Sequence, residues 1–432
     1  MTAVTVIGAG LAGCEAAWAL AEHGVPVTLC EMKPQKFSPA HHSAGFAELI
    51  CSNSLKAMRL ASAAGLLKAE MERMGAIVVA AAKECAVPAG GALAVDRDRF
   101  SAIITERIRS HPNITVCEGE VTRIPEEGYV IVAAGPLASD ALSEAIAAHT
   151  GSEGLHFYDA AAPIVERDSV DMTRAFFAAR YGRGDDDYIN CPMNKEEYEA
   201  FYDALVSAER AALHDCDRMD VYEGCMPVEV LASRGHDAIR YGPLKPVGLT
   251  DPATGHRPWA VVQLRAENAA GTLYNLVGFQ TNLKFGEQKR VFSMIPGLGH
   301  AVFARYGVMH RNTFLDSPRL LDSRLRLKKE PRIRFAGQIT GVEGYIESAA
   351  AGILTGLDLV RELRGEMPLF LPEETMLGAL MRYVSDETVK NFQPMGANMG
   401  LLPPLGQKIR DKQARYQAMA ERSLRALDAL KL

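Results

Sequence analysis

The chain has 432 residues, 48% of them hydrophobic, a formal net charge of −6 and eight cysteines. This length allows two or three domains with sizeable cores, and the negative charge argues against a wholly basic nucleic-acid-binding protein. No apolar run approaches the roughly 18 residues of a membrane span, and no leader-like segment stands out. Since the cysteines form neither a CxxC pair nor a zinc-like spacing, we expect a reduced, cytoplasmic protein without a metal site.

A glycine-rich turn is predicted directly after the first strand, which covers 4–7. In a dinucleotide-binding βαβ unit the first glycine (Gly8) permits the tight turn, and the second (Gly10) lets the backbone approach a pyrophosphate. The third, Gly13, allows close packing of helix on strand. Glu31, after the second strand, can accept a hydrogen bond from a ribose hydroxyl. The predicted cofactor-binding residues here are Gly8, Ala9, Gly10, Leu11, Ala12, Gly13 and Glu31.

The next segment predicts further parts of a doubly wound sheet. A helix is expected from about 55 to 74, with Ser52, Asn53 and Ser54 as its caps. Asp96 is expected to open a second helix, and the remaining predicted elements are strands over 114–117 and 129–134. This βαβ succession is typical of an α/β fold with a parallel sheet.

The pattern then changes to that of an inserted α+β domain. A long charged helix is predicted over 195–213, and strands over 259–264 and 272–277 are predicted to pair as a hairpin. The predicted borders give a dinucleotide-binding domain in two parts, 1–158 and 301–432 with a C-terminal helix, around an inserted domain over 159–300.

A second glycine-rich turn follows a strand predicted over 332–336 and precedes a helix over 346–363. Flavoproteins of the glutathione-reductase type need such a late helix, because its positive end stabilises the reduced flavin. A nicotinamide alone leaves this turn without a role, so FAD is the favoured cofactor. The predicted fold is a glutathione-reductase-like FAD-binding Rossmann fold with an inserted α+β domain. The cofactor-binding residues predicted in this region are Gly337, Gln338, Gly344 and Tyr345.

Positive charge is unevenly distributed along the chain. Residues 284–334 hold twelve Lys or Arg against four Asp or Glu, and the segment from 405 holds seven against three. These segments could form a surface that faces RNA phosphates, or they could be solvated helix faces with local acidic partners.

Three sequence blocks together resemble one family. They are the glycine-rich block at 8–17, the block at 48–56 around Cys51, and the block at 335–348. The chain is similar over its full length, as far as 391–398, to the folate- and FAD-dependent tRNA (uracil-5-)-methyltransferases, TrmFO. The related wobble-uridine enzymes, MnmG or GidA, share the flavin blocks but are longer and lack the Cys51 block.

The resemblance implies a reaction that needs thiols. Methylation of uracil at C5 requires a thiolate that adds to C6 and a base for the C5 proton. The resemblance matches Cys51 and Cys225 to the family's functional cysteines, with Cys225 as the nucleophile and Cys51 as the base or flavin-methylene partner. Cys51 precedes the predicted helix start, where a thiol pKa is lowered. From local sequence alone, either cysteine could instead be a packing residue.

The implied ligands are 5,10-methylenetetrahydrofolate as carbon donor, FADH2 as reductant, NAD(P)H to reduce the flavin again, and tRNA, with no S-adenosylmethionine. Tyr345 is expected to stack on the folate pterin. His41 and His42 are not expected to bind a metal. The cysteines expected to serve packing are Cys14, Cys30, Cys85 and Cys117.

Four alternatives stay open at this point. The substrate could be ribosomal RNA, or the enzyme could modify wobble uridines as MnmG does. The chain could also be a flavin-containing RNA-binding protein without catalysis, or a flavin oxidoreductase for small molecules.

Overall fold

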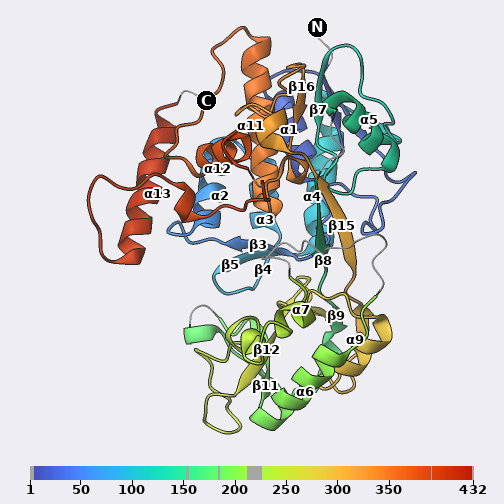
Figure 1. The fold of residues 1–432 in the computed structure, drawn as a ribbon, viewed down its shortest axis with the longest axis vertical. Helices are drawn as coiled ribbons and strands as arrows, with labels where there is room; N and C mark the ends of the chain where they lie inside the picture. The colour runs from blue at the N-terminus through green and yellow to red at the C-terminus, as the bar shows by residue number, and fades with distance from the viewer. Residues whose placement is uncertain (1–3, 152–154, 183–184, 212–225, 391, 431–432) are drawn as a thin grey trace.

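The computed structural model describes residues 4–151, 155–182, 185–211, 226–390 and 392–430. Figure 1 shows two lobes, with the N-terminal and C-terminal segments in one and the middle of the chain in the other. The apolar residues form two large clusters that follow this division. One cluster draws on residues between 4 and 146 and between 314 and 427, and the other on residues between 162 and 301.

The first lobe is built on a five-stranded parallel sheet in the order β16-β7-β1-β2-β6. Its strands are β1 (Val4–Ile7), β2 (Val27–Glu31), β6 (Ile114–Glu118), β7 (Tyr129–Val132) and β16 (Ile333–Phe335). The last three residues of β7 and all of β16 are buried, as expected for parallel strands covered on both faces. The predicted doubly wound sheet is therefore confirmed.

Helices α1 (Leu11–Glu22) and α11 (Tyr345–Leu363) lie side by side against this sheet (Figure 1). Their small residues permit the close approach, since a Cβ on Gly352 would stand 2.2 Å from the Ala12 carbonyl oxygen. A Cβ on Gly356 would stand 2.8 Å from that of Ala16. The late helix predicted over 346–363 is confirmed, and its packing brings the two glycine-rich turns together.

The predicted helix over 55–74 is partly wrong. Its first residues form β3 (Ser54–Ala57), which pairs with β5 (Ala92–Val95), and α2 covers Ala63–Arg73. Ser62 caps α2 by accepting a hydrogen bond from the Gly65 amide at 3.2 Å. Asn53, predicted as a cap, instead donates from Nδ2 to the carbonyl oxygens of Val95 and Ala266. Tertiary hydrogen bonds therefore override the local capping signal.

This lobe also contains a three-stranded sheet in the order β3-β5-β4 and several further helices. Asp96 caps α4, as predicted, and Glu70 of α2 accepts hydrogen bonds from the first amides of α12. The elements are α3 (Ile77–Glu84), β4 (Ala86–Val87), α4 (Arg97–Ser110), α5 (Asp140–Thr150), α10 (Ser317–Leu320), α12 (Met376–Ser385) and α13 (Lys412–Asp428).

The second lobe contains a six-stranded antiparallel sheet in the order β10-β11-β12-β13-β9-β14. The predicted hairpin is confirmed as β12–β13, and α6 has a capping box from Asn194 and Glu197. This helix ends at Ser207, short of the predicted 213. The elements are β9 (Ile164–Glu166), β10 (Phe176–Phe177), β11 (Tyr188–Met193), α6 (Lys195–Ser207), α7 (Val228–Ala232), α8 (Ala238–Tyr241), β12 (Ala260–Ala266), β13 (Leu273–Leu276), α9 (Phe285–Phe292) and β14 (Phe303–Arg305).

The chain enters and leaves the second lobe through a two-stranded antiparallel ribbon. Strands β8 (Leu155–Ala160) and β15 (Met309–Phe314) pair over their whole length. An inserted unit is therefore confirmed, whereas the residue borders at 158 and 300 stay predictions. Within the described ranges, no helix is long and apolar enough to cross a membrane.

Candidate functional site

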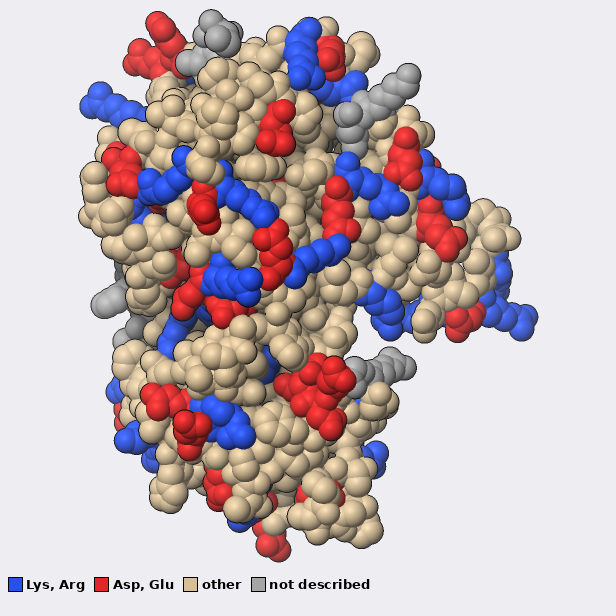
Figure 2. All heavy atoms as spheres, turned by 180° about the vertical axis from the view of Figure 1, so that it is seen from behind, with Lys and Arg blue, Asp and Glu red and all other residues tan. Residues whose placement is uncertain are grey.

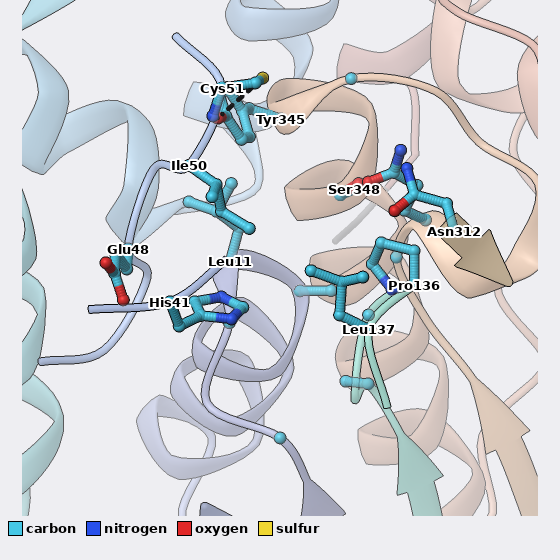
Figure 3. A pocket seen from close by; sticks show the side chains of 18 of the residues that line it. Leu11, His41, Glu48, Ile50, Cys51, Pro136, Leu137, Asn312, Tyr345 and Ser348 are labelled. Atoms are coloured by element: carbon cyan, nitrogen blue, oxygen red, sulfur yellow. Dashed lines mark hydrogen bonds between the residues drawn. The ribbon is translucent and has the colours of Figure 1, made fainter. Parts of the chain in front are cut away.

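A cavity of about 390 Å³ opens between the two glycine-rich turns and the loop around Cys51. In Figure 3, Cys51 and Tyr345 lie together at one end of the wall, and His41 and Glu48 lie farther along it. Gln280 of the second lobe also reaches this wall. The predicted residues that line the cavity are Gly8, Ala9, Gly10, Leu11, Ala12, Glu31, Cys51, Gly337, Gln338, Gly344 and Tyr345.

The three N-terminal glycines meet different surroundings. Gly8 has a φ of +100°, in the region that favours glycine, and Gly10 has open space where a Cβ would stand. Gly13 does not line the cavity, and a Cβ there would lie 1.8 Å from the Gly8 carbonyl oxygen. These surroundings match the turn, the open approach and the helix–strand packing that the sequence predicts for each position.

Glu31 lies at the end of β2 with its carboxylate on the cavity wall. Its Oε2 accepts a hydrogen bond from the Ala9 amide at 2.7 Å, and its Oε1 accepts one from the Lys33 amide at 3.1 Å. The carboxylate therefore ties the first turn to β2. Because each carboxylate oxygen has further lone pairs, Glu31 can still accept from a ribose hydroxyl.

Glu48 folds the loop after β2 against the same cavity. Its carboxylate accepts hydrogen bonds from the amides of His42, at 2.9 Å, and Ser43, at 3.1 Å, and pairs with Lys33. His41 contacts Ser38 through Nδ1 at 2.6 Å. The described residues contain no cluster of His, Cys, Asp and Glu that could hold a metal ion.

The second turn presents the N-terminus of α11 to the cavity. Gly337 and Gly344 both have positive φ, +85° and +119°, and a Cβ on Gly337 would stand 2.8 Å from Ala12 Cβ. The first residue of α11 is Tyr345. Since the amides at a helix N-terminus carry partial positive charge, this end of the cavity suits a ligand with negative charge.

Cys51 lies in a loop that three arginines hold. Arg97 Nη1 donates to the carbonyl oxygens of Leu49 and Ile50, at 2.8 and 3.1 Å, and Arg305 Nη2 donates to Ile50 at 2.9 Å. Arg265 donates from Nη2 to Ser52 Oγ and from Nε to Asn53 Oδ1, both at 2.9 Å. Arg265 and Arg305 come from β12 and β14, so both lobes fix this loop.

The prediction that Cys51 precedes a helix start is wrong, because the residues after it form strand β3. Positive charge comes instead from Arg97 and Arg305, which interact electrostatically with Cys51. Sequence reasoning missed all three arginines. No local motif marks them, because they converge on one loop from positions far apart in the chain.

Tyr345 contacts Cys51 directly. The phenol oxygen accepts a hydrogen bond from the Cys51 amide at 2.8 Å and lies 3.0 Å from Cys51 Sγ (Figure 3, dashed lines). Burial, and then the electrostatic interaction with Cys51, raise the pKa of Tyr345 well above its usual value, so the phenol keeps its proton at neutral pH. Cys225 lies outside the described residues.

Three of the four predicted packing cysteines are buried. Burial raises the pKa of the Cys14 thiol strongly and that of Cys30 and Cys85 to about 11, which leaves these thiols protonated. For Cys117 a packing role is wrong, because it is exposed on β6, one of the two edge strands of the parallel sheet.

Most basic residues of 284–334 have acidic partners. This pairing favours the alternative that they are helix faces with local acidic partners over the alternative that they form a phosphate-binding surface. On the face of the molecule that Figure 2 shows, Lys and Arg are interspersed with Asp and Glu. The pairs are Lys284–Glu209, Arg290–Glu287, Arg319–Asp316, Arg324–Asp358, Arg326–Asp322, Lys328–Glu387, Arg332–Glu330 and Arg334–Asp358.

The basic segment from residue 405 onward differs from residues 284–334 in its ion pairing. Lys408, Arg410 and Arg415 line a surface hollow together with Tyr416, and none of them has an acidic partner among the described residues. This hollow is therefore the better candidate for contact with phosphates.

Comparison with known proteins gives consistent results. The model of the family "Glucose inhibited division protein A" matches residues 3–367. Methylenetetrahydrofolate--tRNA-(uracil-5-)-methyltransferase TrmFO of Desulforamulus reducens is 59% identical over 424 residues, covering 98% of this chain and 96% of the relative. The protein of the same name from Acetivibrio thermocellus is 58% identical, with 98% and 97% covered.

Among solved structures, Aquifex aeolicus GidA (crystal form II) superposes with a TM-score of 0.70 at 16% identity, covering 99% of this chain and 73% of GidA. At this identity the likeness concerns the fold alone, and it confirms the flavoprotein-like architecture predicted from the two glycine-rich turns. The fold, the matching family model and the high identity over nearly the whole chain agree. The chain belongs to the TrmFO family of methylenetetrahydrofolate–tRNA-(uracil-5-)-methyltransferases, within the wider GidA family.

Proposed function

We propose that this protein methylates uracil at C5 in tRNA, with 5,10-methylenetetrahydrofolate as carbon donor and a reduced flavin as reductant. The observation that carries the proposal is the placement of a thiol, Cys51, on the wall of a cavity lined by two glycine-rich turns. TrmFO relatives that bear this activity in their names are 57–59% identical to the chain.

The residues present fit FAD. Gly10 leaves open space at the N-terminus of α1, which suits a pyrophosphate, and Glu31 can accept from the ribose. The N-terminus of α11 faces the other end of the cavity and would stabilise a negatively charged flavin ring. When bound, the reduced flavin supplies the hydride that converts the transferred methylene to a methyl group.

The chain's own residues supply the thiols and orientation. We assign to Cys225 the addition to uracil C6 and to Cys51 the acceptance of the C5 proton. Tyr345 orients Cys51 through its two contacts with that residue. The stacking of its ring on the folate pterin and the use of NAD(P)H to reduce the flavin are further parts of this proposal.

We place contact with the tRNA backbone at the hollow lined by Lys408, Arg410 and Arg415, since these cations have no acidic partners in the described part of the chain. Phosphate contacts of this kind weaken as salt increases.

The experiment is transfer of label from methylene-labelled tetrahydrofolate to unmodified tRNA, with NADPH present, S-adenosylmethionine absent and ribosomal RNA as a parallel substrate. Label in 5-methyluridine of tRNA supports the whole proposal. Label in ribosomal RNA alone would keep the chemistry and change the substrate, whereas a flavin reduced by NADPH without any label would contradict the methylation.

Cys51→Ala tests the thiol. We expect at least a 100-fold loss of label transfer with unchanged flavin content, because a general base typically contributes 10²–10⁴-fold. Cys117→Ala is the matched control, since that cysteine is exposed on the edge strand and does not line the cavity. Unchanged transfer by Cys51→Ala would remove the residue from the mechanism.

A further inference from the structure

The hydrogen bonds at the Tyr345 phenol define the direction of its contact with sulfur. Besides the Cys51 amide at 2.8 Å, the Ser52 amide donates to the same oxygen at 3.3 Å. A phenol oxygen has two lone pairs and one hydrogen. Because two amide hydrogens occupy the lone pairs, the phenol hydrogen is the one that points to Cys51 Sγ, 3.0 Å away. The sulfur therefore accepts this hydrogen bond.

The charges that face the Cys51 loop are predominantly positive. Arg97 contributes from the start of α4, Arg265 from β12 and Arg305 from β14, whereas one carboxylate, Glu267, pairs with Arg97 at 2.5 Å. Among the described residues, three guanidinium groups against one carboxylate leave an excess of two positive charges at this loop. Two further charged pairs near the loop are each neutral in sum. Lys56 of β3 pairs with Glu347 of α11 at 2.7 Å, and Lys33 pairs with Glu48 at 3.4 Å.

This excess lies in a buried environment. Arg265 is 7% exposed, and burial lowers the pKa of both Arg265 and Arg305 from their usual values. Buried cations require a nearby anion, since an uncompensated buried charge is strongly unfavourable. Cys51 interacts electrostatically with Arg97 and Arg305, and its sulfur already accepts the phenol hydrogen.

We propose that Tyr345, Arg97 and Arg305 hold Cys51 as a thiolate at neutral pH. Tyr345 donates its hydroxyl hydrogen to the sulfur, and the two guanidinium groups supply the compensating charge. Tyr345 and the arginines are positioning residues, because they act through Cys51. The thiol proton is released to solvent when this site forms.

This inference deepens the proposed function by assigning a charge state to its base. A thiolate can accept the C5 proton of the uracil ring directly and becomes a neutral thiol, with no other group required to remove a proton first. The acidity of Cys51 is measurable without RNA or folate, so failure of this inference and failure of the proposed methylation are distinguishable.

The experiment is alkylation of the flavin-loaded full-length protein with iodoacetamide from pH 5 to 10, followed by mass spectrometry of the Cys51 peptide. Only the thiolate reacts, so the midpoint of the rate profile reports the acidity of Cys51. We expect a midpoint below 7, compared with about 8.5 for an unperturbed cysteine. Tyr345→Phe keeps the ring and removes the donor, and we expect its midpoint at least one pH unit higher. At a pH well below both midpoints this corresponds to about tenfold slower alkylation, because the thiolate fraction there falls tenfold per pH unit.

Two further variants keep the result interpretable. Arg305→Met removes one cation outside the glycine-rich turns and is expected to raise the midpoint as well. Tyr383→Phe is the matched control, since its hydroxyl donates to the Gln393 carbonyl oxygen and Tyr383 does not line the cavity. A wild-type midpoint at or above 8.5, equal midpoints for wild type and Tyr345→Phe, or no alkylation of Cys51 at any pH would overturn the inference.

Discussion

Gly10 and Gly13 are three residues apart, yet the molecule needs them for different reasons. Gly10 has no protein atom within 4 Å of the place where a Cβ would stand and borders the cavity. Gly13 faces the backbone of Gly8 so closely that no Cβ fits there. Substitution by alanine at the two positions should therefore separate ligand binding from folding.

We expect Gly13→Ala to destabilise the protein by about 1–3 kcal/mol, the usual range for forced overpacking. Gly10→Ala should unfold at the same temperature as wild type without cofactor, but bind FAD at least tenfold more weakly, because the methyl group occupies the approach to the helix N-terminus. Thermal unfolding and flavin fluorescence titration measure the two effects. Equal loss of stability in both variants would contradict this division.

At this scale the sequence was informative where a role depends on the backbone of a few consecutive residues, as for Gly8, Gly13 and Gly337. It was uninformative where a role depends on residues that are far apart in the sequence and meet only in the folded structure. Arg97, Arg265 and Arg305 are separated by tens of residues or more, and nothing in their neighbouring residues indicates that they hold one loop. Such positions follow only from the tertiary structure.

At the scale of elements, a buried carboxylate on the side of one helix can cap the N-terminus of another helix. Glu15 of α1 accepts hydrogen bonds from the Ile77 and Val78 amides, at 3.3 and 2.8 Å, and thereby caps α3. Burial raises the pKa of Glu15 to about 8, against the two backbone hydrogen bonds, which lower it. The folded protein therefore binds a proton that the unfolded chain releases near pH 4.5.

The sign of the pH dependence follows from this raised pKa. The contribution of Glu15 to stability is fully present below about pH 4.5 and is lost as the pH rises through about 8, at up to about 1.4 kcal/mol per pH unit. We expect Glu15→Gln, which cannot ionise, to remove this component. Urea unfolding at pH 5.5, 7 and 8.5 measures it, with the exposed Glu144→Gln as control. An identical pH slope in Glu15→Gln and wild type would exclude Glu15 as its source.

Elements with strong periodicity were predicted well, among them α4, α11 and the β12–β13 hairpin. The error at 55–74 has a specific cause. Leu55 lies in β3 and is buried, and its spacing from Leu66, close to three full helical turns, imitates one helical face. Pairing of β3 with β5 decides the local structure, and this partner lies more than 30 residues farther along the chain.

At the scale of the whole molecule, the two lobes meet at the Cys51 loop. Arg265 of β12 contacts Ser52 and Asn53, and Asn53 in turn donates to the Ala266 carbonyl oxygen. The antiparallel lobe therefore sets the position of a thiol that belongs to the sequence of the other lobe.

We expect Arg265→Met to lower label transfer at least tenfold while FAD binding changes less than twofold, because the cofactor-binding turns belong to the first lobe alone. Arg174→Met serves as control, since Arg174 forms an exposed ion pair with Glu197 in the same lobe as Arg265. Loss of FAD binding in Arg265→Met, parallel to the loss of transfer, would show that the arginine supports the whole cavity and not the thiol specifically.

The ribbon of β8 and β15 has a consequence for the modular history and engineering of this chain. Ala160 lies opposite Met309, so the chain returns to the point from which it left. A short turn between these two residues would close the nucleotide-binding lobe, whose apolar cluster includes no residue from 161–308. The antiparallel lobe is thus an inserted module that could be gained, lost or exchanged at the Ala160–Met309 pair, without any change in the strand order of the parallel sheet.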